Sequence, residues 1–471
     1  MVRMLVLMLA LMPLLALRAE AASYYVDGRS GCDENEGTSV ERAWQTLDRA
    51  NAALTPGDVC IVRGGVYKDS QIAPERSGLP DAPITYVAYE GEKPEVTGGR
   101  SGSIVLLADR SYVTIKGFAI HSATEHDWIV NISGEKAHHN RIEGCDITDP
   151  EGYAPVVIAD GAAYNTVTGC TVHDTGGGDE QTGDCIVMNV GAHHNTIIGN
   201  RCYNGCHSQI MALNGSHHNV IEGNDLYSTN RAWAGAGVNL PLGADANTVV
   251  GNRIHDLGYI TDEKCAIQID SADNVIRNNV IHDVGAFGIA LQSYAFRGTP
   301  QSASNNLVAN NTVVNTGRQG LVIISKGESI SRNNRVVNNI VVGSPRGWYE
   351  SAAWIMAFDT YHLKEIVQPG EWFGNVFESN LFLHARAGES DMVLYNHKGP
   401  AATWSIPELE SAYPETFRGN VEVDPQFVDP ANGEFVLKAS SPALDAGLDV
   451  GSSFQGKAPD IGAVEREAGN P

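Results

Sequence analysis

The chain has 471 residues, 42% of them hydrophobic, which is enough to bury a large core. Its 56 acidic and 32 basic residues give a formal net charge of −24 at pH 7. Such a charge disfavours binding to nucleic acid or anionic lipid. It would also repel an acidic polymer unless a cation such as Ca²⁺ lay between the two sets of carboxylates.

The first 21 residues have the pattern of a secretory signal peptide. Arg3 gives a basic start, Leu5 to Leu17 form an almost unbroken apolar run, and the small residues Ala19 and Ala21 stand where a signal peptidase reads the chain. The run is shorter than the roughly 20 residues needed to span a bilayer. We therefore expect residues 1–21 to be removed and the mature protein to be secreted or periplasmic, without membrane insertion.

Residues 22–80 read as an N-terminal cap. Tyr24 to Val26 predict a strand, and Trp44 to Leu54 have the spacing of a short amphipathic helix. Pro56 to Asp58 then form a turn that leads into a second predicted strand, Val59 to Val62.

A repeat follows, and each of its units begins with Asn. The alternating apolar residues inside the units are mostly Val and Ile, which indicates short strands and not helices. One unit cannot bury its own inward face, so the units must stack into parallel sheets around one core. A leucine-rich repeat of similar length would use mainly Leu, which these units do not. The lead residues are Asn140, Asn165, Asn195, Asn219, Asn247, Asn274, Asn306 and Asn334.

The fifth position after each lead residue predicts a ladder of side-chain amides at a bend. Most units have Asn there, often after a Gly that suits a tight corner. The first two units have Cys145 and Cys170 instead. We expect these two to touch, bonded or not, with Cα atoms roughly 4.4–6.8 Å apart. Cys202, on an inward position, should be buried and free. The ladder residues are Asn200, Asn224, Asn252, Asn279, Asn311 and Asn339.

The pattern as a whole predicts an all-β fold, a right-handed parallel β-helix over residues 81–385, closed by a C-terminal segment at 386–471. Each unit should be one turn, with neighbouring lead Cα atoms about 4.8 Å apart. We expect the protein to be a monomer.

Several segments resemble the opening of the parallel β-helix polysaccharide lyases, most closely the pectate lyase family nine type. The resemblance continues from the cap into the first coils, and it implies a β-helix that acts on a polysaccharide. The matching runs are Tyr24-Tyr-Val-Asp, Ala43-Trp-Gln-Thr-Leu, Pro56-Gly-Asp, Arg63-Gly-Gly-Val-Tyr, Gly91-Glu-Lys-Pro and Tyr112-Val-Thr-Ile-Lys-Gly-Phe.

The resemblance also implies a catalytic Lys and a group of Asp ligands for Ca²⁺. In that family these Asp residues lie in Asp-Gly-Phe and Asp-Asp-Gly-Trp-Asp runs, which this chain lacks. The nearest segment, 176–185, offers Asp179, Glu180 and Asp184, and alternation adds Asp270 as a further candidate ligand.

The candidate site is placed by insertions that lengthen some units. They cover 175–183, 228–235, 259–263 and 293–304, and we expect them to leave equivalent corners and line one groove. Alternation points the side chains of the following strands outward into that groove. Lys264 is the candidate base, Arg231 the candidate neutraliser of a substrate carboxylate, and His207 an alternative base or proton donor. The candidate substrate-binding residues are Asn239, Gln268, Gln292, Trp233 and Tyr294.

Three functions stay open at this point. The first is β-elimination at a uronate-containing polymer. The second is glycoside hydrolysis, for which Asp184 and Asp270 would serve if they lie within about 10 Å of each other. The third is non-catalytic carbohydrate binding.

Two histidine patterns are interpreted as structural. The column His173, Tyr203, Tyr227, His255 and His282 follows one position of the repeat and indicates packing at a coil corner. The pairs His138-His139, His193-His194 and His217-His218 precede lead Asn residues at a bend, where the repeat itself accounts for them.

Overall fold

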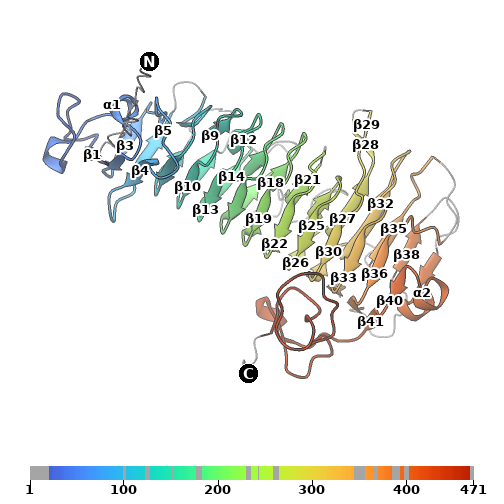
Figure 1. The fold of residues 1–471 in the computed structure, drawn as a ribbon. Helices are drawn as coiled ribbons and strands as arrows, with labels where there is room; N and C mark the ends of the chain where they lie inside the picture. Colours follow the sequence, from blue (N-terminus) through green and yellow to red (C-terminus); the bar gives the residue numbers. More distant parts are fainter. Residues whose placement is uncertain are drawn as a thin grey trace, which may run out of the picture.

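The structure is a computed structural model. It describes residues 21–98, 102–121, 128–149, 152–176, 183–229, 235–241, 243–257, 265–296, 298–343, 356–364, 370–384, 393–396 and 402–466. Their strands form an elongated solenoid whose turns follow the chain from one end to the other (Figure 1). No helix in these ranges is long and apolar enough to cross a bilayer.

Three long sheets, here called A, B and C, make up the solenoid. Sheet A consists of β1 (Ser23–Val26), β2 (Val59–Val62), β4 (Ile84–Ala88), β7 (Val113–Lys116), β10 (Arg141–Glu143), β13 (Thr166–Thr168), β16 (Thr196–Ile198), β19 (Val220–Glu222), β22 (Thr248–Val250), β25 (Val275–Arg277), β30 (Leu307–Ala309), β33 (Arg335–Val337), β36 (Val376–Glu378) and β40 (Phe417–Arg418).

Sheet B consists of β3 (Val66–Lys68), β5 (Glu95–Thr97), β8 (Ala119–His121), β11 (Asp146–Asp149), β14 (Thr171–Thr175), β17 (Arg201–Gly205), β20 (Asp225–Tyr227), β23 (Arg253–His255), β26 (Val280–Val284), β31 (Thr312–Thr316), β34 (Ile340–Val342), β37 (Leu381–Leu383) and β41 (Val421–Glu422).

Sheet C consists of β6 (Val105–Leu106), β9 (Trp128–Ser133), β12 (Ala154–Ala159), β15 (Ile186–Met188), β18 (Ser208–Ala212), β21 (Ala236–Leu240), β24 (Cys265–Ile269), β27 (Phe287–Ser293), β32 (Leu321–Ser325), β35 (Met356–Asp359), β38 (Val393–Asn396) and β39 (Ala402–Trp404). Short hairpins join β28 (Ala295–Phe296) to β29 (Thr299–Pro300) and β42 (Phe427–Asp429) to β43 (Glu434–Leu437).

The register confirms that each Asn-led unit is one turn. Ile142 pairs with Val167, which pairs with Ile197 in the next turn, and all three side chains are fully buried. A third strand completes each turn in sheet C, as β21, β27 and β32 do. The parallel β-helix prediction is therefore confirmed.

The solenoid extends beyond both of the predicted limits, 81 and 385. β1 and β2 of the predicted cap already pair in sheet A, and β40 continues that sheet after the last predicted turn. Those limits mark changes in the sequence pattern and not the ends of the ladder.

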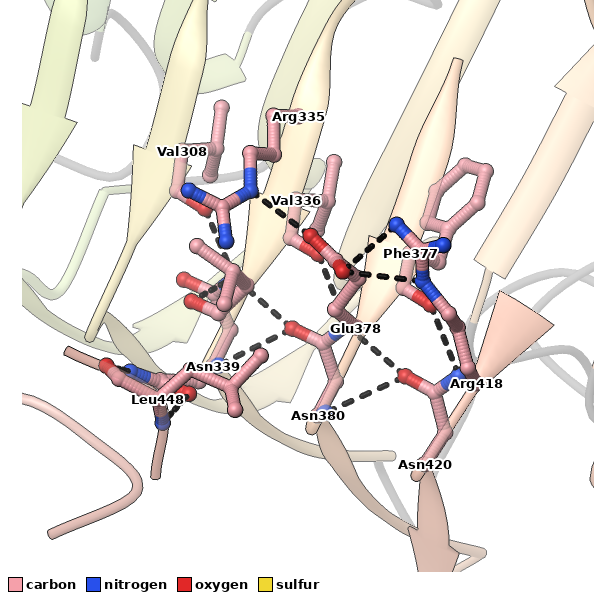
Figure 2. A network of polar contacts seen from close by, with 12 residues as sticks. Val308, Arg335, Val336, Asn339, Phe377, Glu378, Asn380, Arg418, Asn420 and Leu448 are labelled. Carbon is pink, nitrogen blue, oxygen red and sulfur yellow. Dashed lines mark hydrogen bonds and ion pairs between the residues drawn. The ribbon is translucent and has the colours of Figure 1, made fainter. Parts of the chain in front are cut away.

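Two asparagine ladders run along the two edges of sheet A. In the second ladder, the Oδ1 atom of Asn224 accepts hydrogen bonds from the backbone N–H (2.9 Å) and the Nδ2 atom (3.0 Å) of Asn200. Figure 2 shows the same pattern at its C-terminal end, from Asn339 to Asn380 and Asn420. Each rung also binds a carbonyl of the preceding turn, so the buried amides are satisfied.

The lead residues form the first ladder by the same geometry. The Oδ1 atom of Asn195 lies 2.9 Å from the backbone nitrogen of Asn165, and the contact repeats as far as Asn375. Sequence reasoning used these residues only as markers of the repeat and missed their ladder.

Cys145 and Cys170 lie at neighbouring rungs, in the second ladder's column, and their thiols are close enough to interact. Both are buried and free, and so is Cys202. The predicted register at these three positions is confirmed.

The ends of the core are covered by two short helices. α1 (Leu47–Ala53) lies within the longer helix predicted at 44–54 and packs Leu47 and Ala50 into the first turns. α2 (Ile406–Ala412) packs Ile406 and Leu409 at the other end. Two 3-10 turns, η1 (Val40–Arg42) and η3 (Pro430–Asn432), lie outside the core. Covering the ends removes apolar surface that further coils would otherwise bury.

The outer face of sheet B has a stack of rings. Neighbouring centroids from His173 to His282 lie 4.8–5.2 Å apart, and Asp146 and Asp225 contact His173 and His255 at 3.0 Å. The structural interpretation of this column is confirmed.

The C-terminal segment folds back over the end of the same face. Phe427, Phe435 and Leu437 pack with partly buried Val280, Val314 and Val342 of sheet B. Figure 1 shows this segment curled against the later turns.

A charged group secures the outer face of sheet A near this end. The Glu378 carboxylate lies between Arg335 and Arg418, 2.7 Å from each (Figure 2). Burial alone would raise the pKa of Glu378, but the two guanidinium groups outweigh it and hold that pKa below its ordinary value.

Candidate functional site on the outer face of sheet C

The outer face of sheet C is built by simple alternation along its strands. Ile267 and Ile269 of β24 point into the core, so Gln268 between them points outward, as predicted. Asn239 of β21 also points outward and pairs with Gln268 in the next turn. Asp270, directly after β24, takes the following outward position.

One outward row passes through eight consecutive strands, and it is mostly apolar. Polar side chains occupy its two middle positions, and beyond Val157 the row continues to another polar residue, Asn131 of β9. In order, the row is Val157, Val187, Met211, Asn239, Gln268, Ala290, Val322 and Ala357. Except for the half-buried Gln268, all of these side chains are buried although they point away from the core.

The apolar residues on either side form two separate clusters. The first contains Val157, Val187 and Met211 with Tyr153 and Trp128 at its edge. The second contains Phe287, Ala290, Val322 and Ala357. The two polar positions therefore separate two buried apolar patches.

The polar side chains between these clusters contact one another. The fully buried Asp270 carboxylate accepts hydrogen bonds from the Nε2 atom of Gln268 (2.8 Å) and the hydroxyl of Tyr294 (3.2 Å). Asn239 is 8% exposed, and its Oδ1 atom has no hydrogen-bond partner. Burying such an oxygen unpaired costs about 1–3 kcal/mol, so this position favours a role other than stability.

Gln292 is the neighbour of Asp270 in the next turn, by extension of the Ile269–Leu291 register. It is buried, and its Nε2 atom lies 3.6 Å from the sulfur of Cys265. The structure thus brings together five of the predicted residues: Asn239, Gln268, Asp270, Gln292 and Tyr294.

Asp184 and His207 form a second group at the start of sheet C. The Nδ1 atom of His207 lies 3.0 Å from Oδ1 of the fully buried Asp184. The other carboxylate oxygen, Oδ2, is buried without a hydrogen-bond partner. The half-buried imidazole also approaches the hydroxyl of Ser208 at 3.4 Å.

Local backbone contacts hold this pair at the corner between sheets B and C. The backbone N–H groups of Gly183 and Asp184 both donate to the carbonyl of Tyr153, and that of His207 donates to Gly183. Burial and the nearby Asp184 raise the pKa of Tyr153. Sequence reasoning missed Tyr153 and Ser208. Ser208 directly follows His207, which was the available signal for it, whereas nothing near Tyr153 in the sequence indicated its place beside Asp184.

Asp184 and Asp270 do not share one site, contrary to the sequence expectation. Asp184 precedes β15 and Asp270 follows β24, three strand steps along the sheet. At about 4.8 Å per step this separates them by about 14 Å before their offset along the strands is added. That exceeds the roughly 10 Å allowed for a hydrolytic carboxylate pair and excludes their binding one ion together.

The insertions also do not all leave the same corner. Those at 175–183, 228–235 and 259–263 connect sheet B to sheet C, as expected. The one at 293–304 leaves the far end of sheet C towards sheet A and contains the β28–β29 hairpin. The length of an insertion in the sequence does not show which corner of the turn it extends.

Several predicted residues lie outside the described ranges. They are Lys264, Arg231, Trp233, Asp179 and Glu180. Lys264 directly precedes β24 in the sequence, and Arg231 and Trp233 precede β21.

The described residues do not fit a calcium site of the kind implied by the family resemblance. Ca²⁺ takes six to eight oxygen ligands, several of them carboxylates. Within the described ranges, no three His, Cys, Asp or Glu side chains are placed to hold a metal ion. Asp184 and Asp270 belong to different groups, as shown above.

Two family models match the chain. Residues 24–239 match the model described as Pel9A-like, right handed beta helix region, and residues 213–350 match the model described as right handed beta helix region. These matches confirm the family resemblance inferred from the opening segments, and with it the right-handed parallel β-helix.

Two solved structures of similar fold are polysaccharide lyases. Pectate lyase Pel9A has a TM-score of 0.51 and 17% identity, over 95% of this chain and 97% of its own. A rhamnogalacturonan lyase has a TM-score of 0.52 and 16% identity, over 67% of this chain and 87% of its own. At these identities the likeness concerns the fold.

A curated relative is a glycosidase by name. It is the lacto-N-biosidase of Bifidobacterium longum subsp. longum, 30% identical over 22% of this chain. This chain spans only 8% of the length of that relative.

Proposed function

Starting from a chain that carries the Pel9A-like right-handed β-helix over residues 24–239, we propose an exported enzyme that cleaves a uronate-containing polysaccharide by β-elimination. The polymer lies across the outer face of sheet C. The enzyme acts as a monomer. It acts outside the cytoplasm, because the first 21 residues have the pattern of a signal peptide.

One observation carries this proposal: two neighbouring polar positions interrupt the apolar part of the outward row of sheet C. Asn239 and Gln268, beside Asp270, are buried or half-buried between two buried apolar clusters. Buried polar groups of this kind are costly for stability. Amides and a carboxylate next to apolar surface are the groups that bind sugar hydroxyls, while apolar patches contact the sugar rings.

β-Elimination removes the C5 proton of a uronate and breaks the C4–O bond, and the leaving oxygen takes up a proton. Lys264 is our candidate for the base that takes the C5 proton. Arg231 would neutralise the substrate carboxylate, which makes that proton more acidic. Trp233 and Tyr294 would contact sugar rings, and Asn239, Gln268 and Gln292 would bind hydroxyl groups.

His207 is the candidate for the second proton transfer. Asp184 accepts a hydrogen bond from Nδ1, which favours the tautomer whose basic nitrogen is Nε2. Such an imidazole either takes a proton or, once charged, gives one to the leaving oxygen. We derive no step through calcium, since the described residues do not fit it.

Product analysis tests the proposal. The purified protein is incubated with pectate, alginate, rhamnogalacturonan, glycosaminoglycans and neutral glycans, with and without added Ca²⁺. β-Elimination gives unsaturated products that absorb in the ultraviolet, together with new reducing ends. No unsaturated product from any uronate polymer would refute elimination, and a Lys264→Ala protein with full activity would refute the role of Lys264.

Glycoside hydrolysis is the second candidate, favoured by the local identity with the lacto-N-biosidase. Because Asp184 and Asp270 are too far apart to act as a pair, one of them would need another carboxylate as partner. The same panel distinguishes this reaction, since hydrolysis gives reducing ends without ultraviolet absorbance. Binding without products would favour the non-catalytic alternative.

A further inference from the structure

Three histidine pairs lie at the corner between sheets C and A, just before lead Asn residues of the first ladder. Within each pair the two Nδ1 atoms face each other. They are 3.0 Å apart in His138–His139, 2.8 Å in His193–His194 and 2.8 Å in His217–His218.

The last two pairs also stack directly on each other. The ring centroids of His193 and His217 are 5.2 Å apart with planes 3° from parallel, and those of His194 and His218 are 5.1 Å apart at 10°. His194 and His218 are exposed, and His193 and His217 are half-buried. Four imidazoles therefore share one accessible patch, here called the histidine patch.

The fold does not require histidine at this corner. The turn between the first and second pairs has Ala163 and Tyr164 in the same two positions, with the same bridge contacts. Tyr164 has the same left-handed backbone as His194 and His218, with φ of 57° against 54° and 54°. The histidines can therefore be exchanged for this natural Ala-Tyr pair without changing the corner.

We propose that the histidine patch binds divalent copper or nickel, one ion per pair, through the two Nδ1 atoms. Metal–nitrogen bonds of about 2.0–2.1 Å that end on atoms 2.8 Å apart meet at roughly 85–90°. That angle matches the square-planar or tetragonal geometry of Cu²⁺ and Ni²⁺, and it is smaller than the tetrahedral angle that Zn²⁺ prefers.

Both Nδ1 lone pairs of a pair are available to a metal ion when each ring carries its proton on Nε2 and not on Nδ1.

The pairs provide only two ligands each, which agrees with the lack of any closed three-ligand site in the described ranges. Water or a small anion would complete the coordination. The site is therefore open, exchangeable and separate from the Asp184–His207 group.

The test titrates Cu²⁺ into the tag-free, metal-stripped full chain and follows it by calorimetry and by electron paramagnetic resonance. We expect nitrogen hyperfine coupling from two imidazoles and tighter binding of Cu²⁺ and Ni²⁺ than of Zn²⁺. A variant with His193→Ala, His194→Tyr, His217→Ala and His218→Tyr copies the Ala163–Tyr164 corner. It should fold normally and lose at least two bound Cu²⁺ ions, leaving the isolated His138–His139 pair.

His362→Ala is the matched control, because His362 is an exposed histidine outside the three pairs. It should leave the titration unchanged. Unaltered Cu²⁺ stoichiometry in the fourfold variant, or a copper spectrum without two-imidazole coupling, overturns the proposal. Zn²⁺ binding tighter than Ni²⁺ overturns the geometric argument for the metal.

Discussion

The edges of sheet A and the corner between sheets B and C differ in how their buried polar groups are satisfied. Along both edges of sheet A, stacked Asn side chains satisfy the buried backbone turn after turn. The B–C corner has no such ladder in the described ranges. It has insertions and single buried polar groups instead, such as Asp184 with its unpartnered Oδ2. The ladders restrict the residues at the edges of sheet A to those that can form the repeated hydrogen bonds. The B–C corner has no such restriction and can accommodate reactive side chains.

The largest effect, on turnover, should come from replacing His207 at the B–C corner. We expect His207→Ala to lower turnover on the polymer identified by the panel by about 10²–10⁴-fold, because it removes a proton-transfer group. Thermal stability should change little. Measured initial rates and melting curves check this.

His173→Phe provides the control, since His173 forms a similar His–Asp contact on sheet B and Phe keeps the ring stack with Tyr203. Its turnover should be unchanged. Equal losses in both variants would show that His207 acts through the fold and not through chemistry.

Breaking a ladder should have the next largest effect, this time on stability. Asn224→Ala leaves two buried donors of Asn200 without their acceptor. At about 1–3 kcal/mol for each such group, we expect the free energy of unfolding to fall by about 3 kcal/mol. Denaturant unfolding measures it.

Asn224→Cys should cost less than the Ala variant, because cysteine occupies this column at 145 and 170 and its sulfur is a weak acceptor. A loss equal to that of Asn224→Ala would mean that the column tolerates cysteine only at its N-terminal end.

Extending the ladder by one rung should raise the free energy of unfolding, by a smaller amount. Cys170→Asn adds an amide that can bind Asn200 and the carbonyl of Ile142, as the following rungs do in their own turns. We expect stabilisation by about 0.5–1.5 kcal/mol, measured by unfolding under reducing conditions. Destabilisation would indicate that the Cys145–Cys170 contact itself contributes more than a rung.

The smallest effect should be on how the stability of the fold depends on pH. Burial and neighbouring imidazoles lower the pKa values of His139, His193 and His217. Their neutral forms stabilise the fold above about pH 6.5, the unfolded value, and this contribution is lost as the pH falls through their folded pKa. We expect the fourfold Ala-Tyr variant to lose less stability than the wild type between pH 7 and 5.

His255 should respond in the opposite direction. Burial lowers its pKa, but Asp225 and Asp256 outweigh burial and raise it. Its contribution is present at low pH and is lost as the pH rises through the folded value. His255→Phe should therefore steepen the loss of stability on acidification, and a parallel shift in both variants would contradict these assignments.

Sequence reasoning predicted what depends on local periodicity. The inward columns, the second ladder and the contact of Cys145 with Cys170 all follow from alternation and turn chemistry. The outward directions of Asn239 and Gln268 followed in the same way. These features require only the chain within one turn and its immediate neighbour.

What depends on position along the solenoid was predicted less well. Alternation tells which face a side chain takes, but not how many strands separate it from another on that face. Asp184 and Asp270 share the outer face of sheet C yet lie three strands apart. The prediction also assigned the hairpin insertion at 293–304 to the wrong corner, because the length of an insertion does not show which two sheets it connects.

The C-terminal segment that packs on sheet B has a consequence for the order in which the protein is assembled. Turns can form one after another as the chain is made, since each needs only its predecessor. Asn278, by contrast, donates to the carbonyl of Ala463, 185 residues later, and Val280, Val314 and Val342 pack against Phe427, Phe435 and Leu437 of the same late segment. The nascent chain must therefore carry an exposed apolar strip until that segment has been made, and a chain that stopped before Phe427 would keep the strip exposed.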